Sequence, residues 1–212
     1  AEQIDVMLRV IRAARPTVEN FLDLGCGDGI MGRAVLLQNP DARGVFLDFS
    51  APMVDAAKEK TSGKHTFIVQ DYGTLDWLKS VELAAPFDVI VSGFSIHHQP
   101  DERKKELYRE LFYLLKPGGV FLNLEHVAPE DTWGETLFDE LMIDTIHAFA
   151  LRTGTNKTRE QVAHEFNSRE DKGANILAPL ETQCVWLREI GYIHVDCYLK
   201  IFELALFGGV RP

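Results

Sequence analysis

A short apolar run that ends in three closely spaced glycines restricts the fold of this chain more than any other feature. The run occupies residues 21–24, and Gly25, Gly27 and Gly29 follow it before a helical pattern that continues to Gln38. Glycine occurs where the backbone turns sharply or where a bound molecule approaches it closely. The segment therefore predicts a strand, a ligand-binding loop and a helix, in that order.

The alternation of strand and helix continues to residue 124. The expected strands are near-continuous apolar runs, which are typical of a parallel sheet covered on both faces, whereas a half-exposed antiparallel strand would alternate apolar and polar residues. We expect these strands at residues 21–24, 45–48, 66–69, 87–92 and 120–124. The sequence thus predicts an α/β fold with a mostly parallel sheet.

Residues 129–178 interrupt this rhythm with two long polar-rich helical patterns. We interpret them as a helical insertion, a lid over the sheet and the active site, within a single domain that spans residues 1–212. Its large apolar residues could roof a small-molecule pocket or simply pack the insertion; they are Trp133, Phe138, Met142, Phe149 and Phe166. A helix over 180–190 follows, and residues 192–208 supply two last strands whose turn is poorly marked.

Composition narrows the classes of partner. The 212 residues include 22 Lys plus Arg against 32 Asp plus Glu, a net charge of −10 with no basic cluster, so neither nucleic acid nor an anionic membrane is an expected partner. Three scattered cysteines suit a reducing compartment, and no apolar run resembles a membrane span or a signal peptide. We expect a cytoplasmic protein. Homodimerisation is left open, as is whether residues precede Ala1.

The glycine loop favours a nucleoside that carries positive charge and no phosphate. A dinucleotide fingerprint requires the spacing G-x-G-x-x-G, but Ile30 stands where the third glycine is needed, so a nicotinamide dehydrogenase is disfavoured. Asp23 and Asp28 bring negative charge to the loop, which suits a cationic ligand. Asp48, at the end of the second strand, lies where an acidic residue can hold both ribose hydroxyls.

Four segments together resemble a class I S-adenosylmethionine-dependent methyltransferase. They are LDLGCGDG at 22–29, Asp48 after the second strand, Asp71 after the third, and LKPGG at 115–119 ahead of the fifth. The resemblance is strong over residues 20–125. It implies a Rossmann-like, doubly wound, mostly parallel seven-stranded sheet with an antiparallel C-terminal strand. It also implies S-adenosylmethionine as cofactor and S-adenosylhomocysteine as product.

The same resemblance implies a set of cofactor contacts. Gly25 and Gly27, with Cys26 between them, would lie under the methionyl part, with Asp23 near its ammonium group. Asp48 would hold the ribose diol. The remaining expected contacts are Phe49 and Met53 beside adenine, Asp71 and Tyr72 at its amino edge, and Ser92 at the end of the fourth strand. The alternatives are that Phe49 and Met53 are core residues, that Asp71 only ends a strand and that Cys26 only fills space.

The reacting end is expected after the fourth strand, where His97 and His98 follow at the carboxyl edge of the sheet. Methyl transfer needs a base only when the acceptor must lose a proton, and either histidine could take it; Glu125 and His126 are second candidates. The alternative is that the paired histidines only shape the loop. No spacing fixes a metal geometry, so no metal is expected.

Three functions remain open at this stage. The leading hypothesis is methyl transfer to a small-molecule acceptor. The second is non-methylating chemistry on the same cofactor, because the insertion followed by C-terminal strands is similar to carboxy-S-adenosylmethionine synthase, although the glycine loop and the segment 92–98 depart from that enzyme. The third is a regulatory module that binds the cofactor without turnover.

Overall fold

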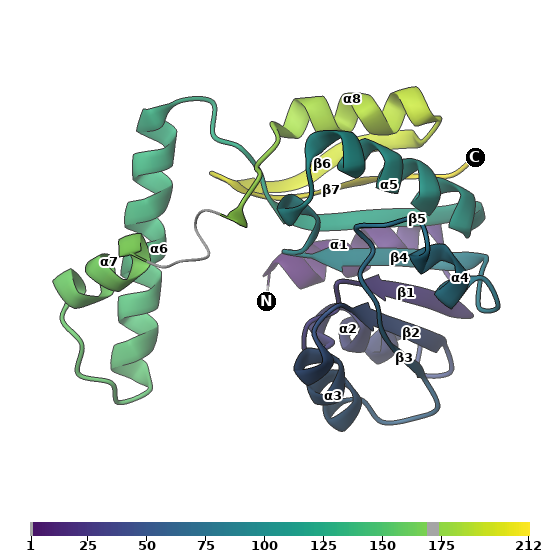
Figure 1. Ribbon diagram of the computed structural model, residues 1–212, viewed down its shortest axis with the longest axis horizontal. Coiled ribbons are helices and arrows are strands. Elements are labelled where there is room, and N and C mark those ends of the chain that lie inside the picture. Colours follow the sequence, from purple (N-terminus) through teal and green to yellow (C-terminus); the bar gives the residue numbers. More distant parts are fainter. Residues whose placement is uncertain (1, 169–173) are drawn as a thin grey trace.

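The computed structural model describes residues 2–168 and 174–212, and in it one sheet runs through the body of the molecule (Figure 1). Its strand order is β3-β2-β1-β4-β5-β7-β6. Strands β1 to β5 are parallel, and β7 is antiparallel to both β5 and β6. The strands are β1 (Asn20–Leu24), β2 (Arg43–Asp48), β3 (Thr66–Val69), β4 (Phe87–Gly93), β5 (Leu115–His126), β6 (Ile193–Ile201) and β7 (Leu204–Val210). The predicted seven-stranded, mostly parallel sheet is confirmed.

Helices cover both faces of this sheet, as the apolar strands require. The first face carries α1 (Glu2–Ala14), α2 (Ile30–Gln38) and α3 (Ala51–Lys60), and the second carries α4 (Trp77–Val81), α5 (Asp101–Leu114) and α8 (Leu180–Ile190). Successive strand residues face opposite sides: Phe21 and Val89 pack in the first core, and Leu22 and Ile90 pack in the second. Each core is therefore built by the same strands.

The LKPGG segment lies within β5 and not ahead of it as predicted. Leu115 pairs with Phe87 and Val120 pairs with Val89, so the intervening residues form an irregularity that the partner strand does not match. Gly118 and Gly119 instead exchange backbone hydrogen bonds with Arg211, just after β7. The strand continues because the C-terminal strand of the sheet supplies these partners.

The insertion contains α6 (Thr132–Arg152) and α7 (Arg159–Ser168), which we call the arm; residues 169–173 of the insertion lie outside the described residues. The sequence predicts a lid over the sheet, but Figure 1 shows the arm beyond the carboxyl end of β5, beside the sheet and not across a face of it. Its own core is small and centres on Ile143, Val162 and Phe166. Trp133 and Phe149 are 72% and 57% exposed, so these two residues do not form a roof.

The small core of the arm predicts that it opens more easily than the parallel strands. Segments with few buried apolar contacts exchange their amide hydrogens through local openings of low free energy. We expect peptides spanning residues 133–149 and 158–166 to exchange at least about tenfold faster than the peptide 87–92, measured by hydrogen exchange with mass spectrometry. Equal protection of both regions in the free protein would show that the arm is a permanent part of the body.

None of the described helices combines the length and the apolar composition needed to cross a membrane.

Candidate active site

A cavity of about 370 Å³ opens at the carboxyl ends of β1 and β4. These two strands are neighbours at the point where the strand order reverses, and open α/β sheets bind their ligands in the crevice at that point. The loop after β1 and the residues after β4 form opposite walls; the lining residues are Gln3, Ile4, Gly25, Cys26, Gly27, Asp28, Ile30, Met31, Gly93, Phe94 and Leu124. The predicted glycine loop therefore lies at the predicted place.

Two glycines of this loop adopt conformations that other residues rarely adopt. Gly25 has φ +64°, and a Cβ atom there would lie 1.9 Å from Ser95 Oγ. Gly27 has φ +53°, and a Cβ atom there would meet nothing within 4 Å. Gly25 is thus required by close packing against the protein itself, whereas Gly27 borders open space that a ligand can occupy.

Asp48 is held by one backbone N–H of the glycine loop and by one N–H just after β2. Its Oδ2 accepts the N–H of Gly27 at 2.8 Å, and its Oδ1 accepts the N–H of Ser50 at 2.9 Å. A carboxylate can accept about four hydrogen bonds, so each oxygen retains capacity for one ligand hydroxyl. Asp48 is therefore fixed in orientation and still able to bind a ribose diol, although no contact of that kind is present to test its predicted role.

Asp23 does not line the cavity; it is fully buried beneath α2. Its Oδ2 accepts the N–H of Gly32 at 2.7 Å, and its Oδ1 has no hydrogen-bond partner among the residues that the structure describes. Burial raises the pKa of Asp23 to about 8, against the lowering effect of the Gly32 hydrogen bond. With this pKa the carboxyl is mostly protonated at neutral pH, so Asp23 places a buried polar group, and not a full negative charge, next to the glycine loop.

The raised pKa of Asp23 makes a prediction about stability. The unfolded carboxyl titrates near pH 4, so the folded state binds the proton more tightly and stability is lost as the pH rises from about 4 to about 8. Asp23→Asn cannot ionise and escapes this loss. One pKa unit is worth ~1.4 kcal/mol, or about 3–6 °C in a domain of this size.

We therefore expect the Tm advantage of the variant over the wild type to widen by at least about 4 °C between pH 5 and pH 8 in calorimetric scans. Asp28→Asn is the matched control, because the Lys60 hydrogen bond lowers the pKa of Asp28; this carboxyl is ionised in both the folded and the unfolded state above about pH 5, so its Tm difference should not change between pH 5 and pH 8. A Tm difference that is constant across this pH range would contradict the assignment of a raised pKa to Asp23.

The other predicted cofactor residues divide into exposed and buried ones. Phe49 is 71% exposed and Met53 is also exposed, so the expectation that they are core residues is wrong. Asp71 is exposed, and its Oδ1 accepts the N–H of Gly73 at 2.7 Å. These three residues follow the carboxyl ends of β2 and β3, and their exposed side chains can contact a ligand there.

Tyr72, Ser92 and Cys26 are buried and have partners within the protein. The Tyr72 hydroxyl lies 2.5 Å from Ser95 Oγ, and Ser92 Oγ donates to the Leu24 carbonyl at 2.8 Å. The backbone N–H of Cys26 donates to the Leu47 carbonyl, and burial raises the pKa of its thiol, which excludes a thiolate nucleophile. Tyr72 and Ser92 thus brace the loops around the cavity, while Cys26 still contributes to its wall.

A second cavity, of about 300 Å³, contains the predicted histidines. It is lined by His97, His98 and His126, by Phe138, Met142 and Phe166 of the arm, and by Phe94, Asn175 and Leu204. The arm therefore does reach the reacting end through three of its five predicted residues. Of the described residues that line this cavity or the first, only Phe94 lines both.

Glu125 fixes His97 in this second cavity. His97 Nδ1 lies 2.5 Å from Glu125 Oε1, and Glu125 Oε2 accepts the backbone N–H of His97 at 3.0 Å. Both side chains are buried. Because Nδ1 is engaged by a carboxylate, the proton is held there and Nε2 is left as an acceptor; Nε2 makes no hydrogen bond to the described residues. The Nδ1 atom of His98 also has a partner, but this partner is the Ala174 carbonyl, at 3.2 Å, and not a carboxylate.

His126 has a carboxylate partner that sequence reasoning missed. Its Nε2 lies 2.6 Å from Glu203 Oε2, and its ring lies 5.3 Å from the ring of Phe138. Burial raises the pKa of Glu203, which His126 opposes. Glu203 follows Phe202, whose φ of +50° makes the turn between β6 and β7 without the Gly, Pro or Asn that would mark it. The lack of a usual turn residue in this segment was the sequence feature that could have drawn attention to Glu203.

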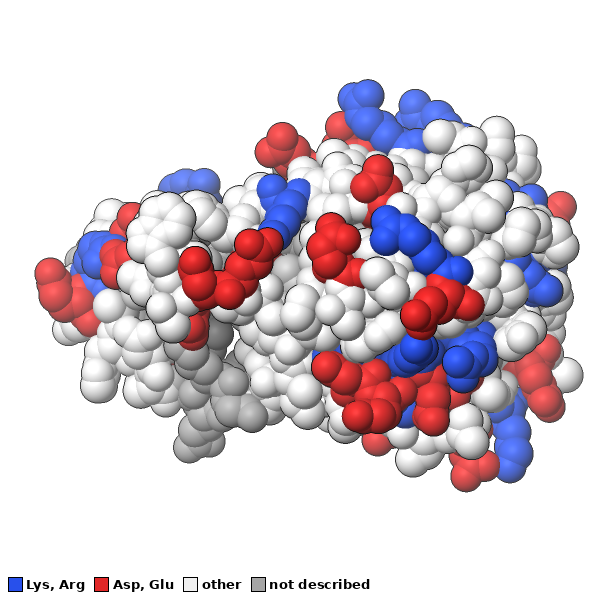
Figure 2. All heavy atoms as spheres, turned by 90° about the horizontal axis from the view of Figure 1, so that it is seen from above, with Lys and Arg blue, Asp and Glu red and all other residues white. Residues whose placement is uncertain are grey.

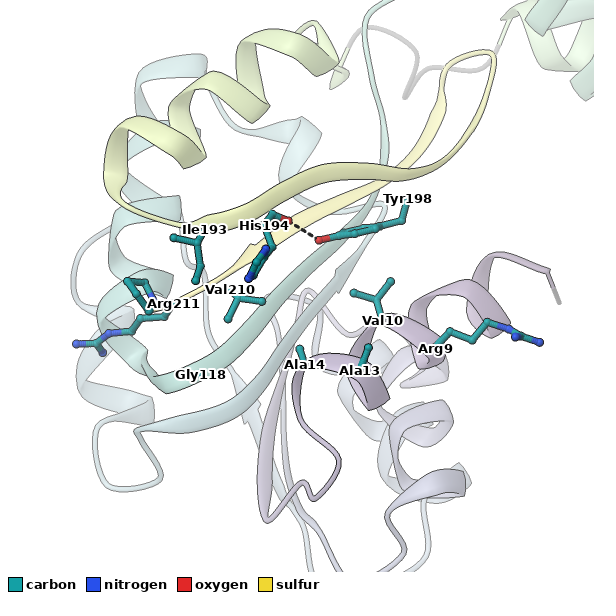
Figure 3. A pocket seen from close by; sticks show the side chains of 11 residues that line it. Arg9, Val10, Ala13, Ala14, Gly118, Ile193, His194, Tyr198, Val210 and Arg211 are labelled. Atoms are coloured by element: carbon teal, nitrogen blue, oxygen red, sulfur yellow. Dashed lines mark hydrogen bonds between the residues drawn. The ribbon is translucent and has the colours of Figure 1, made fainter.

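Among residues 2–168 and 174–212, no group of three or more His, Cys, Asp or Glu side chains has the arrangement that holds a metal ion. A larger cavity, of about 720 Å³, lies between α1 and strands β6 and β7 (Figure 3). Its walls are mainly apolar, and Figure 3 shows that the side chains of Arg9 and Arg211 extend away from it. It contains none of the predicted site residues and lies apart from the carboxyl ends of the parallel strands.

The charged side chains do not form a basic field on the face shown in Figure 2. Lys and Arg alternate there with Asp and Glu across the body and the arm. This distribution agrees with the absence of a basic cluster in the sequence.

Comparison with known proteins identifies the family. A family model described as a methyltransferase domain matches residues 22–121. The chain is 34% identical over 107 residues to malonyl-[acyl-carrier protein] O-methyltransferase 2 of Ilyobacter polytropus, which is 50% of this chain and 38% of that protein. It is 24% identical over 193 residues to carboxy-S-adenosyl-L-methionine synthase of Actinobacillus succinogenes, 89% of this chain and 73% of that protein.

A solved structure supports the same fold. Magnesium protoporphyrin IX methyltransferase of Synechocystis, determined with bound S-adenosylhomocysteine, superposes with a TM-score of 0.63 at 16% identity and covers 100% of this chain and 83% of its own. The fold, the glycine loop and these relatives define a nucleoside-binding α/β domain. Residues 22–121 form a methyltransferase domain of the class I S-adenosylmethionine-dependent type, and the cofactor is S-adenosylmethionine.

The residues present fit this cofactor. Gly27 borders open space, and Asp48 keeps acceptor capacity for a ribose diol. These features can accommodate S-adenosylmethionine, a cation with ribose hydroxyls and no phosphate.

Proposed function

We propose that the protein transfers the methyl group of S-adenosylmethionine to a small, uncharged acceptor whose reacting atom bears a proton, such as a phenol-type hydroxyl. The observation that carries this proposal is the position of His97. Its side chain lines a cavity that shares Phe94 with the cofactor cavity, its Nε2 makes no hydrogen bond to the described residues, and Glu125 fixes its Nδ1. A base of this kind is needed only when the acceptor must lose a proton.

The described residues divide the work between binding and proton transfer. Asp48 and the loop around Gly27 hold the cofactor, which supplies an electrophilic methyl group on a sulfonium. His97 accepts the acceptor's proton at Nε2, and Glu125 holds the imidazole in the tautomer that can accept it. Phe138, Met142 and Phe166 exclude water and orient the acceptor, since alignment supplies much of the rate of such a displacement.

The lining of the two cavities supports the class of acceptor. None of the described residues that line either cavity is Lys or Arg, so an acceptor with a carboxylate or phosphate would have no cation to pair with. Nucleic acid and membrane surfaces are excluded from the proposal for the same reason. Three free cysteines are consistent with a cytoplasmic enzyme.

Cofactor binding is the first test. A ligand that binds only the folded state increases the free energy of unfolding by mass action, by ~2.7 kcal/mol at a concentration one hundred times Kd, and so raises Tm. We expect S-adenosylmethionine and S-adenosylhomocysteine each to raise Tm by about 5–10 °C under that condition, and NADH to leave it unchanged, in thermal unfolding scans. Equal stabilisation by NADH would show that the loop accepts a pyrophosphate.

Turnover is the second test. The protein is incubated with S-adenosylmethionine and, separately, with simple phenols, aliphatic alcohols, amines and carboxylic acids, and S-adenosylhomocysteine is measured by mass spectrometry. The proposal expects formation above the acceptor-free rate with phenols or alcohols. Binding without turnover on any of the four classes, repeated with a metabolite extract, would favour a regulatory module.

A second candidate function is synthesis of a carboxylated S-adenosylmethionine. It is favoured by the 89% of this chain that matches carboxy-S-adenosyl-L-methionine synthase, which includes the arm. The lack of Lys and Arg in the described lining counts against it, because a carboxylated product calls for a cation. The adenosyl product separates the two functions by its mass.

A further inference from the structure

Phe94 stands where the two cavities meet. It lines the cofactor cavity together with Gly25 and Gly93, and it lines the histidine cavity together with His97. Because no other described lining residue is shared, Phe94 forms the partition between donor and acceptor.

The backbone of Phe94 adopts a conformation that a phenylalanine rarely adopts. Its φ is +51°, in the left-handed region that favours glycine. The conformation is locked, since the N–H of Phe94 donates to the Leu124 carbonyl at 2.8 Å and the preceding Gly93 lies against Met31. Residues held in strained backbone conformations cluster at functional sites, because the surrounding structure must overdetermine them.

Packing does not explain why this position carries a large aromatic side chain. Phe94 is 47% exposed, whereas Phe21, Phe46, Phe87, Phe121 and Phe207 are fully buried. A glycine would relieve the backbone strain, and little burial would be lost. The ring is therefore placed toward the two cavities at a cost in stability, and the chemistry of those cavities should account for it.

We propose that Phe94 is a specificity-determining residue whose ring packs against the sulfonium end of the cofactor, and so distinguishes the charged methyl donor from the uncharged product. The face of an aromatic ring attracts a cation, and the attraction grows when water is excluded. S-adenosylmethionine carries a sulfonium charge that S-adenosylhomocysteine lacks. The ring thereby favours donor over product and, as the partition, keeps water from the reacting carbon. This inference rests on the proposed function.

The chain offers a matched control for this residue. Phe202 also adopts a left-handed backbone, with φ +50°, and is 45% exposed, but it lines neither cavity. A substitution at Phe202 therefore removes the same side chain from the same backbone conformation without touching the junction.

The test is calorimetric titration of S-adenosylmethionine and S-adenosylhomocysteine into the wild type, Phe94→Leu, Phe94→Tyr and Phe202→Leu. We expect Phe94→Leu to weaken S-adenosylmethionine binding by about 3- to 10-fold while S-adenosylhomocysteine changes less than about twofold. Phe94→Tyr retains the ring and should keep the wild-type ratio of the two constants, as should Phe202→Leu. If Phe94→Leu fails to fold, Phe94→Gly suits the backbone and gives the same comparison.

A loss of equal size for both ligands in Phe94→Leu, or no loss for either, would overturn the inference. A wild type that binds neither ligand would instead overturn the proposed function. The two failures are distinguishable because the first needs wild-type binding to be observed. A supporting readout is the rate of acceptor-free S-adenosylhomocysteine formation, which should rise in Phe94→Leu as water reaches the reacting carbon.

Discussion

His97→Gln is expected to lower kcat by roughly 10²- to 10⁴-fold with any acceptor that must lose a proton, the range for removal of a positioned general base. Glutamine occupies a similar volume and can still contact Glu125, but it cannot take the proton. The measurement is steady-state kinetics with the best acceptor from the four classes. Binding of S-adenosylhomocysteine should change less than about threefold, because His97 lines the acceptor cavity and not the cofactor cavity.

Two further variants assign the roles around His97. Glu125→Gln leaves the imidazole in place but removes the carboxylate that fixes its tautomer, so it should lower kcat. His98→Gln separates the paired histidines, whose rings lie 4.0 Å apart. A large loss of kcat in His98→Gln with none in His97→Gln would move the base to His98, and a small loss in both would mean that alignment alone drives the reaction.

The body of the fold could be predicted from the sequence because each parallel strand carries its own evidence. An apolar run buried on both faces has one structural solution, and residues 21–24 and 87–92 were placed correctly on that basis. The position of the glycine loop could likewise be predicted, because few residues other than glycine adopt the positive φ of Gly25 and Gly27. Asp48 could be placed because it ends the second apolar run. Local sequence was sufficient wherever local geometry was decisive.

The features that the sequence did not reveal depend on partners distant in the chain. The start of β5 at Leu115 depends on pairing with Phe87 and with Arg211 beyond β7, which no local pattern encodes. The pairing of His126 with Glu203 likewise joins the end of β5 to the turn between β6 and β7, 77 residues further along the chain. The arm was recognised as helical, but its position beside the sheet is set by where β5 ends and not by its own residues.

Asp71→Ala is the matched control for the substitution of Asp48 by alanine. It removes a carboxylate at the same sheet edge, whose Oδ1 accepts the N–H of the nearby Gly73. It should weaken S-adenosylhomocysteine binding less than the corresponding change at Asp48. Asp48 differs because its two oxygens hold Gly27 and Ser50 and each keeps acceptor capacity for a ligand hydroxyl.

Asp48→Ala is expected to weaken S-adenosylhomocysteine binding by roughly 1.5–3 kcal/mol, or about 10- to 150-fold in Kd, the range for hydrogen bonds to a charged group. Titration of an analogue that lacks both ribose hydroxyls separates direct contact from loosening of the loop. If Asp48 binds the diol, the wild type prefers the complete ligand and the variant binds both about equally. If the variant loses affinity for both ligands to the same extent, Asp48 acts only by holding Gly27 and Ser50. An unchanged Kd would mean that another group binds the ribose, and the exposed Asp71 would then be the nearest carboxylate to test.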